Sequence, residues 1–151
     1  MKIRVVWVGR TKSSAIAGIC DDYASRIRHF VPFEIIEIKE PKSVAQRVED
    51  EGRRILDSVA NSDFVVVLDS LGKSWDSGRF SRFIGKHLSE NPKNLVFVIG
   101  GFGGLSGEIK ARADLIWSLS PLTFTHDLTR AVLLEQIYRA FAILHNLPFS
   151  R

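Results

Sequence analysis

Apolar residues along this 151-residue chain gather in short, near-continuous runs separated by segments of helical periodicity. The runs are rich in Val, Ile and Phe, residue types that favour strands. Runs with so little polar alternation indicate strands covered on both faces, as in a parallel sheet flanked by helices. The predicted strands cover Ile3 to Val8, Phe33 to Ile38, Phe64 to Leu68, Leu95 to Ile99 and, more weakly, Leu115 to Leu119.

A helical segment follows each of these runs. The first four helical segments begin at or near a serine, whose hydroxyl can cap the free N–H groups of the first turn. Alternation of strand and helix predicts one α/β domain over residues 1–151, with a mostly parallel sheet flanked by helices. The predicted helices cover Ser14 to His29, Ser43 to Ala60, Ser77 to Ser89, Ser106 to Ala113 and about His126 to Asn146.

The last predicted helix carries apolar side chains around most of its circumference, in the sequence DLTRAVLLEQIYRAFAILHN. A helix that packs on a sheet by one face shows a single apolar stripe, so a second face here must also be covered. We expect that second face to pack on a partner subunit. Burial of the whole helix within one domain is the alternative.

Composition excludes several classes of protein. No apolar stretch approaches the roughly 20 residues that span a bilayer, so the chain is not expected to be a membrane protein. The single cysteine, Cys20, cannot form an internal disulfide, and the N-terminus reads as a first strand and not as a signal peptide, so the expected location is cytoplasmic. A net charge of +4 favours acidic partners such as RNA without requiring them.

A glycine-rich stretch, VIGGFGGLSG, follows the fourth predicted strand and raises the possibility of a phosphate loop. The dinucleotide motif G-x-G-x-x-G fails, because Ser106 stands where its third glycine is needed from Gly101. Neither Gly-Lys pair of the chain is preceded by the first glycine of a P-loop. The four histidines are widely scattered, and with one cysteine they predict no metal site.

Three loops remain that can carry chemistry: LDSLGKSWDS, the glycine stretch, and WSLSPLTFTHDLTR. Loops at the carboxyl ends of parallel strands line the ligand crevice of such a sheet. Their small and uncharged residues near the strand ends suit a flat, uncharged ligand group read by the backbone. Ordinary connecting loops are the alternative.

With the opening KIRVVWVG and the C-terminal AVLLEQIYRAFAILHNLPFSR, these strings resemble the RlmH family of the SPOUT superfamily along essentially the whole chain. The resemblance implies a homodimeric enzyme that transfers a methyl group from S-adenosylmethionine to N3 of a pseudouridine in the large-subunit rRNA of assembled ribosomes. It also implies a deep trefoil knot in the C-terminal part, although chains rarely thread loops.

The resemblance further implies a set of site residues. His126 is expected to contact the substrate or handle its proton, Arg130 to contact RNA phosphate or the base, and Arg151 to supply the final cation. The alternative is that His126 only caps the last helix and that Arg130 anchors the dimer. The cofactor residues carried over are Leu68, Gly100, Leu119, Ser120, Pro121, Leu122, Thr123 and Phe124.

Two departures from the family pattern accompany this match. The chain ends in Pro148-Phe149-Ser150-Arg151 where family members commonly end in Tyr-His-Arg or Tyr-His-Lys, and Thr125 replaces the usual proline before the histidine. The altered tail leaves two alternatives open. One is a noncatalytic dimer that binds S-adenosylmethionine or ribosomes, and the other is a methyltransferase of a different RNA such as tRNA.

Overall fold

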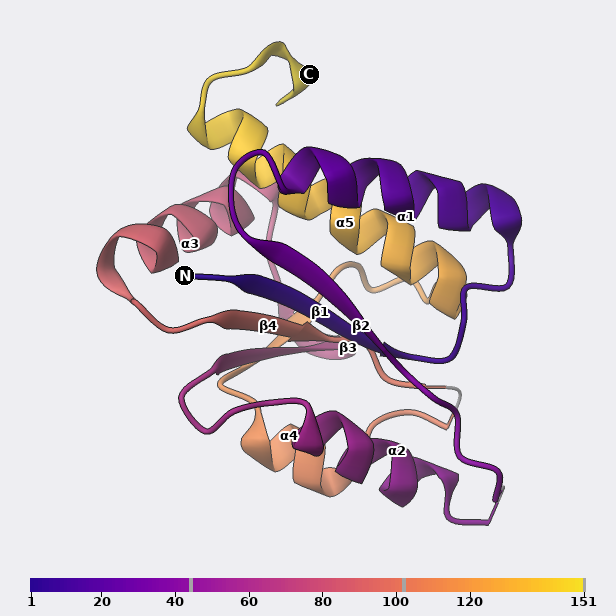
Figure 1. Cartoon of the computed structure of the whole chain (residues 1–151). Coiled ribbons are helices and arrows are strands. Elements are labelled where there is room, and N and C mark those ends of the chain that lie inside the picture. Colours follow the sequence, from indigo (N-terminus) through magenta and orange to yellow (C-terminus); the bar gives the residue numbers. More distant parts are fainter. Residues whose placement is uncertain (44, 102, 151) are drawn as a thin grey trace.

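The protein is an α/β domain with helices on both faces of a five-stranded sheet (Figure 1). The computed structural model describes residues 1–43, 45–101 and 103–150. Strands and helices alternate along the chain, as the sequence predicts. The elements are β1 (Ile3–Val8), α1 (Ser14–Ile27), β2 (Phe33–Ile38), α2 (Arg47–Asp57), β3 (Phe64–Ser74), α3 (Ser77–Glu90), β4 (Leu95–Val98), α4 (Gly107–Arg112), β5 (Leu115–Ser118), α5 (His126–Leu144) and the short 3-10 helix η1 (Pro148–Ser150).

The sheet has the strand order β2-β1-β4-β3-β5, and all its pairs are parallel. Helices α1, α3 and α5 cover one face, and α2 and α4 cover the other (Figure 1). Successive residues of a strand point to opposite faces, so Phe97 joins the core under α1, α3 and α5 whereas Val96 joins the core over α2. Both faces are therefore dry, which confirms the interpretation of the continuous apolar runs.

Three of the first four helices are capped by side-chain oxygens, as the sequence predicts, although two of the caps lie one residue away from the predicted position. Ser13 caps α1 and Asp76 caps α3, each one residue before the serine at which the helix was expected to begin. Ser106 caps α4 as expected. Helix α2 has no side-chain cap and begins at Arg47. The predicted start at Ser43 is therefore wrong, and Val44 within that predicted turn lies outside the described residues.

Helix α5 is covered on several sides by its own chain. It packs on the sheet core and lies against α1 and α3 (Figure 1). The Ser81 hydroxyl of α3 donates a hydrogen bond to the Ala140 carbonyl at 3.1 Å, and Phe30, just beyond α1, stacks on Phe141 at 5.3 Å between ring centroids. Neighbours within the domain thus cover most of the apolar circumference of α5, and Leu128 and Leu144 near its two ends stay exposed.

Neither a membrane span nor a metal cluster is found in the described residues. None of the helices there is long and apolar enough to cross a bilayer. No group of three His, Cys, Asp or Glu side chains that could hold a metal ion occurs in that part of the chain.

Candidate functional site

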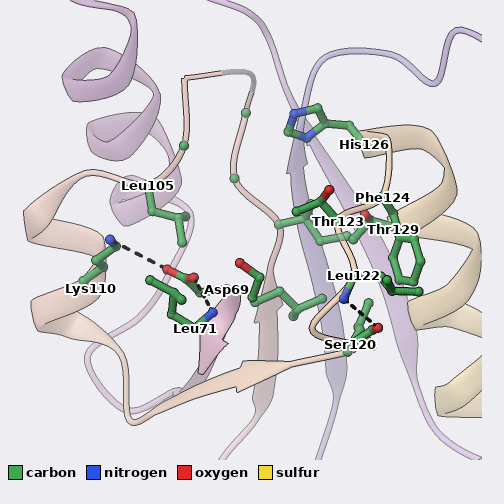
Figure 2. Close-up of a pocket in the computed structure, with 17 residues that line it drawn as sticks. Asp69, Leu71, Leu105, Lys110, Ser120, Leu122, Thr123, Phe124, His126 and Thr129 are labelled. Carbon is green, nitrogen blue, oxygen red and sulfur yellow. Dashed lines mark hydrogen bonds and ion pairs between the residues drawn. The ribbon is translucent and has the colours of Figure 1, made fainter. Parts of the chain in front are cut away.

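A pocket of about 520 Å³ opens at the carboxyl ends of β3, β4 and β5, beside the first turn of α5 (Figure 2). This is the edge at which loops of a parallel sheet meet, so segments far apart in the sequence converge there. Its walls are mostly aliphatic, aromatic and glycine residues. The lining residues are Leu68, Asp69, Ser70, Leu71, Ile99, Gly100, Gly101, Gly104, Leu105, Lys110, Leu119, Ser120, Leu122, Thr123, Phe124, His126 and Thr129.

One wall of the pocket is an irregularity in β3. Trp117 of β5 pairs with both Leu68 and Lys73, so residues 69–72 bulge out between two paired segments of one strand. The bulge carries Asp69 to the pocket and leaves Leu71 92% exposed at its rim. A side chain at Gly72 would meet the backbone of Ile116 at 2.7 Å. The bulge therefore needs glycine at this position for the two strands to approach.

A second wall is the turn from Gly101 to Gly104, which follows β4. The Gly104 N–H donates a hydrogen bond to the Gly101 carbonyl at 3.0 Å, and Gly104 has a left-handed φ of +87°. A Cβ on Gly101 would collide with the Glu51 carboxyl group of α2. A Cβ on Gly100 would lie 2.8 Å from Leu105. In this part of the glycine stretch, the missing side chains make room for groups of the same chain.

Glu51 is a buried acid beneath this turn. It is 2% exposed, and its Oε2 has no hydrogen-bond partner among the described residues. Burial raises the pKa of the Glu51 carboxyl group, while the positive charge of Arg47 acts in the opposite direction. An uncharged carboxyl group is cheaper to bury than a carboxylate, so these surroundings favour the protonated acid.

The third wall is the loop between β5 and α5. The Ser118 hydroxyl donates to the Ser120 carbonyl at 2.9 Å, and the Ser120 hydroxyl accepts from the Leu122 N–H at 3.0 Å. Thr125 then caps α5 by accepting from the Leu128 N–H. The threonine that replaces the family's proline therefore caps the helix, and His126 follows as its first residue on the pocket wall.

The pocket brings together most of the residues predicted from the sequence. Seven of the eight cofactor candidates line it, and the exception is Pro121, which is exposed and not among the lining residues. His126 also lines it, whereas Arg130 does not, and Arg151 lies outside the described residues. Their roles stay predictions. The sequence interpretation missed Asp69 and Lys110, although Asp69 belongs to the motif LDSLGK that carried the resemblance.

Arg130 is buried inside the protein and not presented to solvent. It is 3% exposed, donates to the Val8 carbonyl at 2.7 Å and to the Thr11 hydroxyl at 3.0 Å, and lies 4.7 Å from the Trp7 ring centroid. Burial lowers the pKa of its guanidinium, and Asp127 opposes that shift. Asp127 also accepts from the Ser13 N–H at 2.8 Å. Arg130 and Asp127 together link α5 to the end of β1 and to the segment that follows it.

Arg130→Lys is expected to lower the free energy of unfolding by about 1–2 kcal/mol, because one ammonium cannot reproduce the fork of bonds that a guanidinium makes. Denaturant unfolding checks this, with the exposed Arg53→Lys as a control that leaves stability unchanged. Normal stability combined with weaker binding to RNA would show instead that Arg130 meets the substrate.

A match to a family model shows the class of protein to which this fold belongs. The family model described as "Predicted SPOUT methyltransferase" matches residues 1–149, so the chain belongs to the SPOUT methyltransferase family. This confirms the family prediction.

Relatives that carry the name "Ribosomal RNA large subunit methyltransferase H" match this chain along its whole length. The protein of Trichlorobacter lovleyi is 40% identical, with 99% of both chains covered. The protein of Christiangramia forsetii is 42% identical, covering 99% of this chain and 98% of its own, and that of Streptococcus pneumoniae is 41% identical over 100% of both. The resemblance to the RlmH group is thereby confirmed.

Proposed function

We propose that this protein transfers a methyl group from S-adenosylmethionine to the large-subunit rRNA, at N3 of a pseudouridine in assembled ribosomes. The full-length match to relatives named for large-subunit rRNA methylation carries the proposal. The pocket supports it, because a cavity of about 520 Å³ is of the size that holds a nucleoside-containing cofactor. The reaction places the protein with ribosomes in the cytoplasm.

The residues of the pocket fit the parts of S-adenosylmethionine. Leu68 and Leu119 offer aliphatic surface for a flat adenine, and the backbone of the loop from Leu119 to Phe124 offers N–H and C=O groups to its edge. When bound, the cofactor supplies an electrophilic methyl group on a sulfonium. The chain then has to hold donor and acceptor in line and exclude competing orientations.

His126 is proposed to handle the proton of the acceptor nitrogen. That nitrogen must lose its proton to become nucleophilic, and an imidazole at the pocket wall can accept a proton at this stage. The cation of Arg151 is proposed to stabilise the negative charge that develops on the base.

We also propose the two finer features that the RlmH resemblance implies, a C-terminal trefoil knot and a homodimer. For the knot, the β3 bulge and the loops after β4 and β5 meet in one pocket although these strands lie out of sequence order in the sheet. For the dimer, His126 and the C-terminal tail lie at opposite ends of α5, and a 19-residue helix is roughly 28 Å long. Phe149 packs on Tyr138 at 4.7 Å, so a partner's tail is the better candidate to complete each pocket.

Mass spectrometry of large-subunit rRNA from a deletion strain tests the activity. The methylated pseudouridine is expected to disappear and to return when the gene is restored. An unchanged modification would refute this substrate, and a lost methyl group in tRNA would identify the other RNA. Purified protein that binds S-adenosylmethionine but methylates neither RNA would support the noncatalytic alternative, which the Phe149-Ser150 replacement favours.

A further inference from the structure

Two fixed charges lie in a pocket that is otherwise built from apolar, glycine and hydroxyl groups. Among the described lining residues these are the Asp69 carboxylate and the Lys110 ammonium. Figure 2 shows them on the α4 side of the pocket, across from His126 and Phe124. The Asp69 carboxylate is mostly buried beside aliphatic walls, where an uncompensated charge costs free energy, whereas the Lys110 side chain is about half exposed.

Asp69 is held in place by its own loop. Its Oδ1 accepts a hydrogen bond from the Leu71 N–H at 2.9 Å within the β3 bulge, and its side chain is 19% exposed. Only its second oxygen, Oδ2, faces Lys110. The bulge thus presents one carboxylate oxygen toward the pocket in a defined orientation.

Lys110 extends from α4 toward Asp69 but does not come within the distance of a direct hydrogen bond. Its Nζ lies 3.7 Å from Asp69 Oδ2, longer than the about 2.8 Å of a charge-assisted hydrogen bond. An ammonium has three N–H donors, and a carboxylate has about four acceptor positions, so both groups retain capacity for a ligand. The open pair offers one negative and one positive group side by side.

We propose that Asp69 and Lys110 bind the amino-acid end of S-adenosylmethionine, with Asp69 accepting from the α-ammonium and Lys110 donating to the α-carboxylate. This inference rests on the proposed function, since it assigns groups of that same cofactor site. The amino-acid end of the cofactor has one positive and one negative group. Each of them can therefore face the group of opposite charge in the Asp69–Lys110 pair. The adenine is left to the uncharged wall formed by residues 119–124.

Calorimetry with a matched pair of ligands tests the assignment without relying on catalysis. S-adenosylhomocysteine has the amino-acid end, and 5′-methylthioadenosine has the same adenosine and thioether without it. In Asp69→Asn, the amide oxygen can still accept from the Leu71 N–H, so the bulge is preserved. A hydrogen bond between charged groups is worth enough for affinity for S-adenosylhomocysteine to fall about 10-fold to 100-fold, while affinity for 5′-methylthioadenosine stays within about twofold.

Lys110→Gln provides an independent arm, because this exposed side chain can be changed without disturbing the core. It is expected to weaken S-adenosylhomocysteine selectively, as Asp69→Asn does. Lys86→Gln removes a comparable lysine that pairs with Glu90 on α3, and it should leave both affinities unchanged.

Three outcomes would overturn the assignment. Equal weakening of both ligands in Asp69→Asn would place the carboxylate at the ribose or in the support of the bulge. Unchanged affinities in both pocket variants would remove the pair from the site. A wild-type protein that binds neither ligand would refute the cofactor in the proposed function itself, which separates that failure from the failure of this inference.

Discussion

His126→Ala is expected to lower kcat for ribosome methylation by about 100-fold or more, within the range that positioned acid-base groups contribute. His126 is the imidazole among the described residues of the pocket wall. Alanine removes the proposed proton acceptor. Thr125 still caps α5, so the helix begins at the same place. Affinity for S-adenosylmethionine is expected to be retained, because the aliphatic walls and loop backbone are untouched. Single-turnover methylation and calorimetry measure the two quantities separately.

His29→Ala is the matched control, since this exposed histidine lies outside the pocket residues. It should leave kcat unchanged. If His126→Ala also keeps full kcat, the proton is handled by another group or by water. If it loses cofactor affinity in parallel with activity, His126 contributes to the pocket and not to the chemical step.

Gly72→Ala is expected to destabilise the fold by about 2–3 kcal/mol and to weaken cofactor binding at least tenfold, because overpacking against a rigid neighbour forces the backbone to shift. The added methyl would stand 2.7 Å from the carbonyl carbon and oxygen of Ile116 and 2.8 Å from the Trp117 nitrogen. These atoms belong to β5, which cannot turn aside as a flexible side chain can. The bulge that holds Asp69 would be displaced with them. Thermal unfolding and calorimetry check both effects.

Gly18→Ala is the same chemical change, but it is expected to stabilise the fold, whereas Gly72→Ala is expected to destabilise it. Gly18 lies within α1, and a Cβ there would meet nothing within 4 Å. Replacing an exposed helical glycine by alanine stabilises by about 0.5–1 kcal/mol. A Gly72→Ala protein as stable as Gly18→Ala would show that β3 and β5 can separate at the bulge without cost.

The class of fold could be predicted from the chain because its signals are local. Each strand run is short, apolar and bounded by loops, and two-sided burial of β1 and β4 leaves its mark on consecutive residues. The loop from Leu119 to Phe124 was predicted through family resemblance, since its uncharged residues bear no chemical signature of their own. Seven cofactor candidates converge in the pocket for the topological reason that carboxyl ends of parallel strands meet at one edge.

Features that depend on contacts between distant segments escaped the prediction. The β3 bulge exists because Leu68 and Lys73 both pair with Trp117, a relation that the β3 sequence does not contain. The burial of Arg130 depends on the Val8 carbonyl, 122 positions away. From sequence alone, a charged residue in a polar stretch is predicted to be exposed. Its burial can be recognised only when its partners in the fold are known.

The amino-acid sequence by itself determined the alternating α/β architecture and the membership of a methyltransferase family, because both rest on patterns along the chain. Tertiary structure alone decided which glycines face side chains of the same domain, which arginine is internal, and that Asp69 meets Lys110 on one side of a pocket. The physical reason is that burial and electrostatic pairing act through space, and their partners are set only when the sheet brings its loops together.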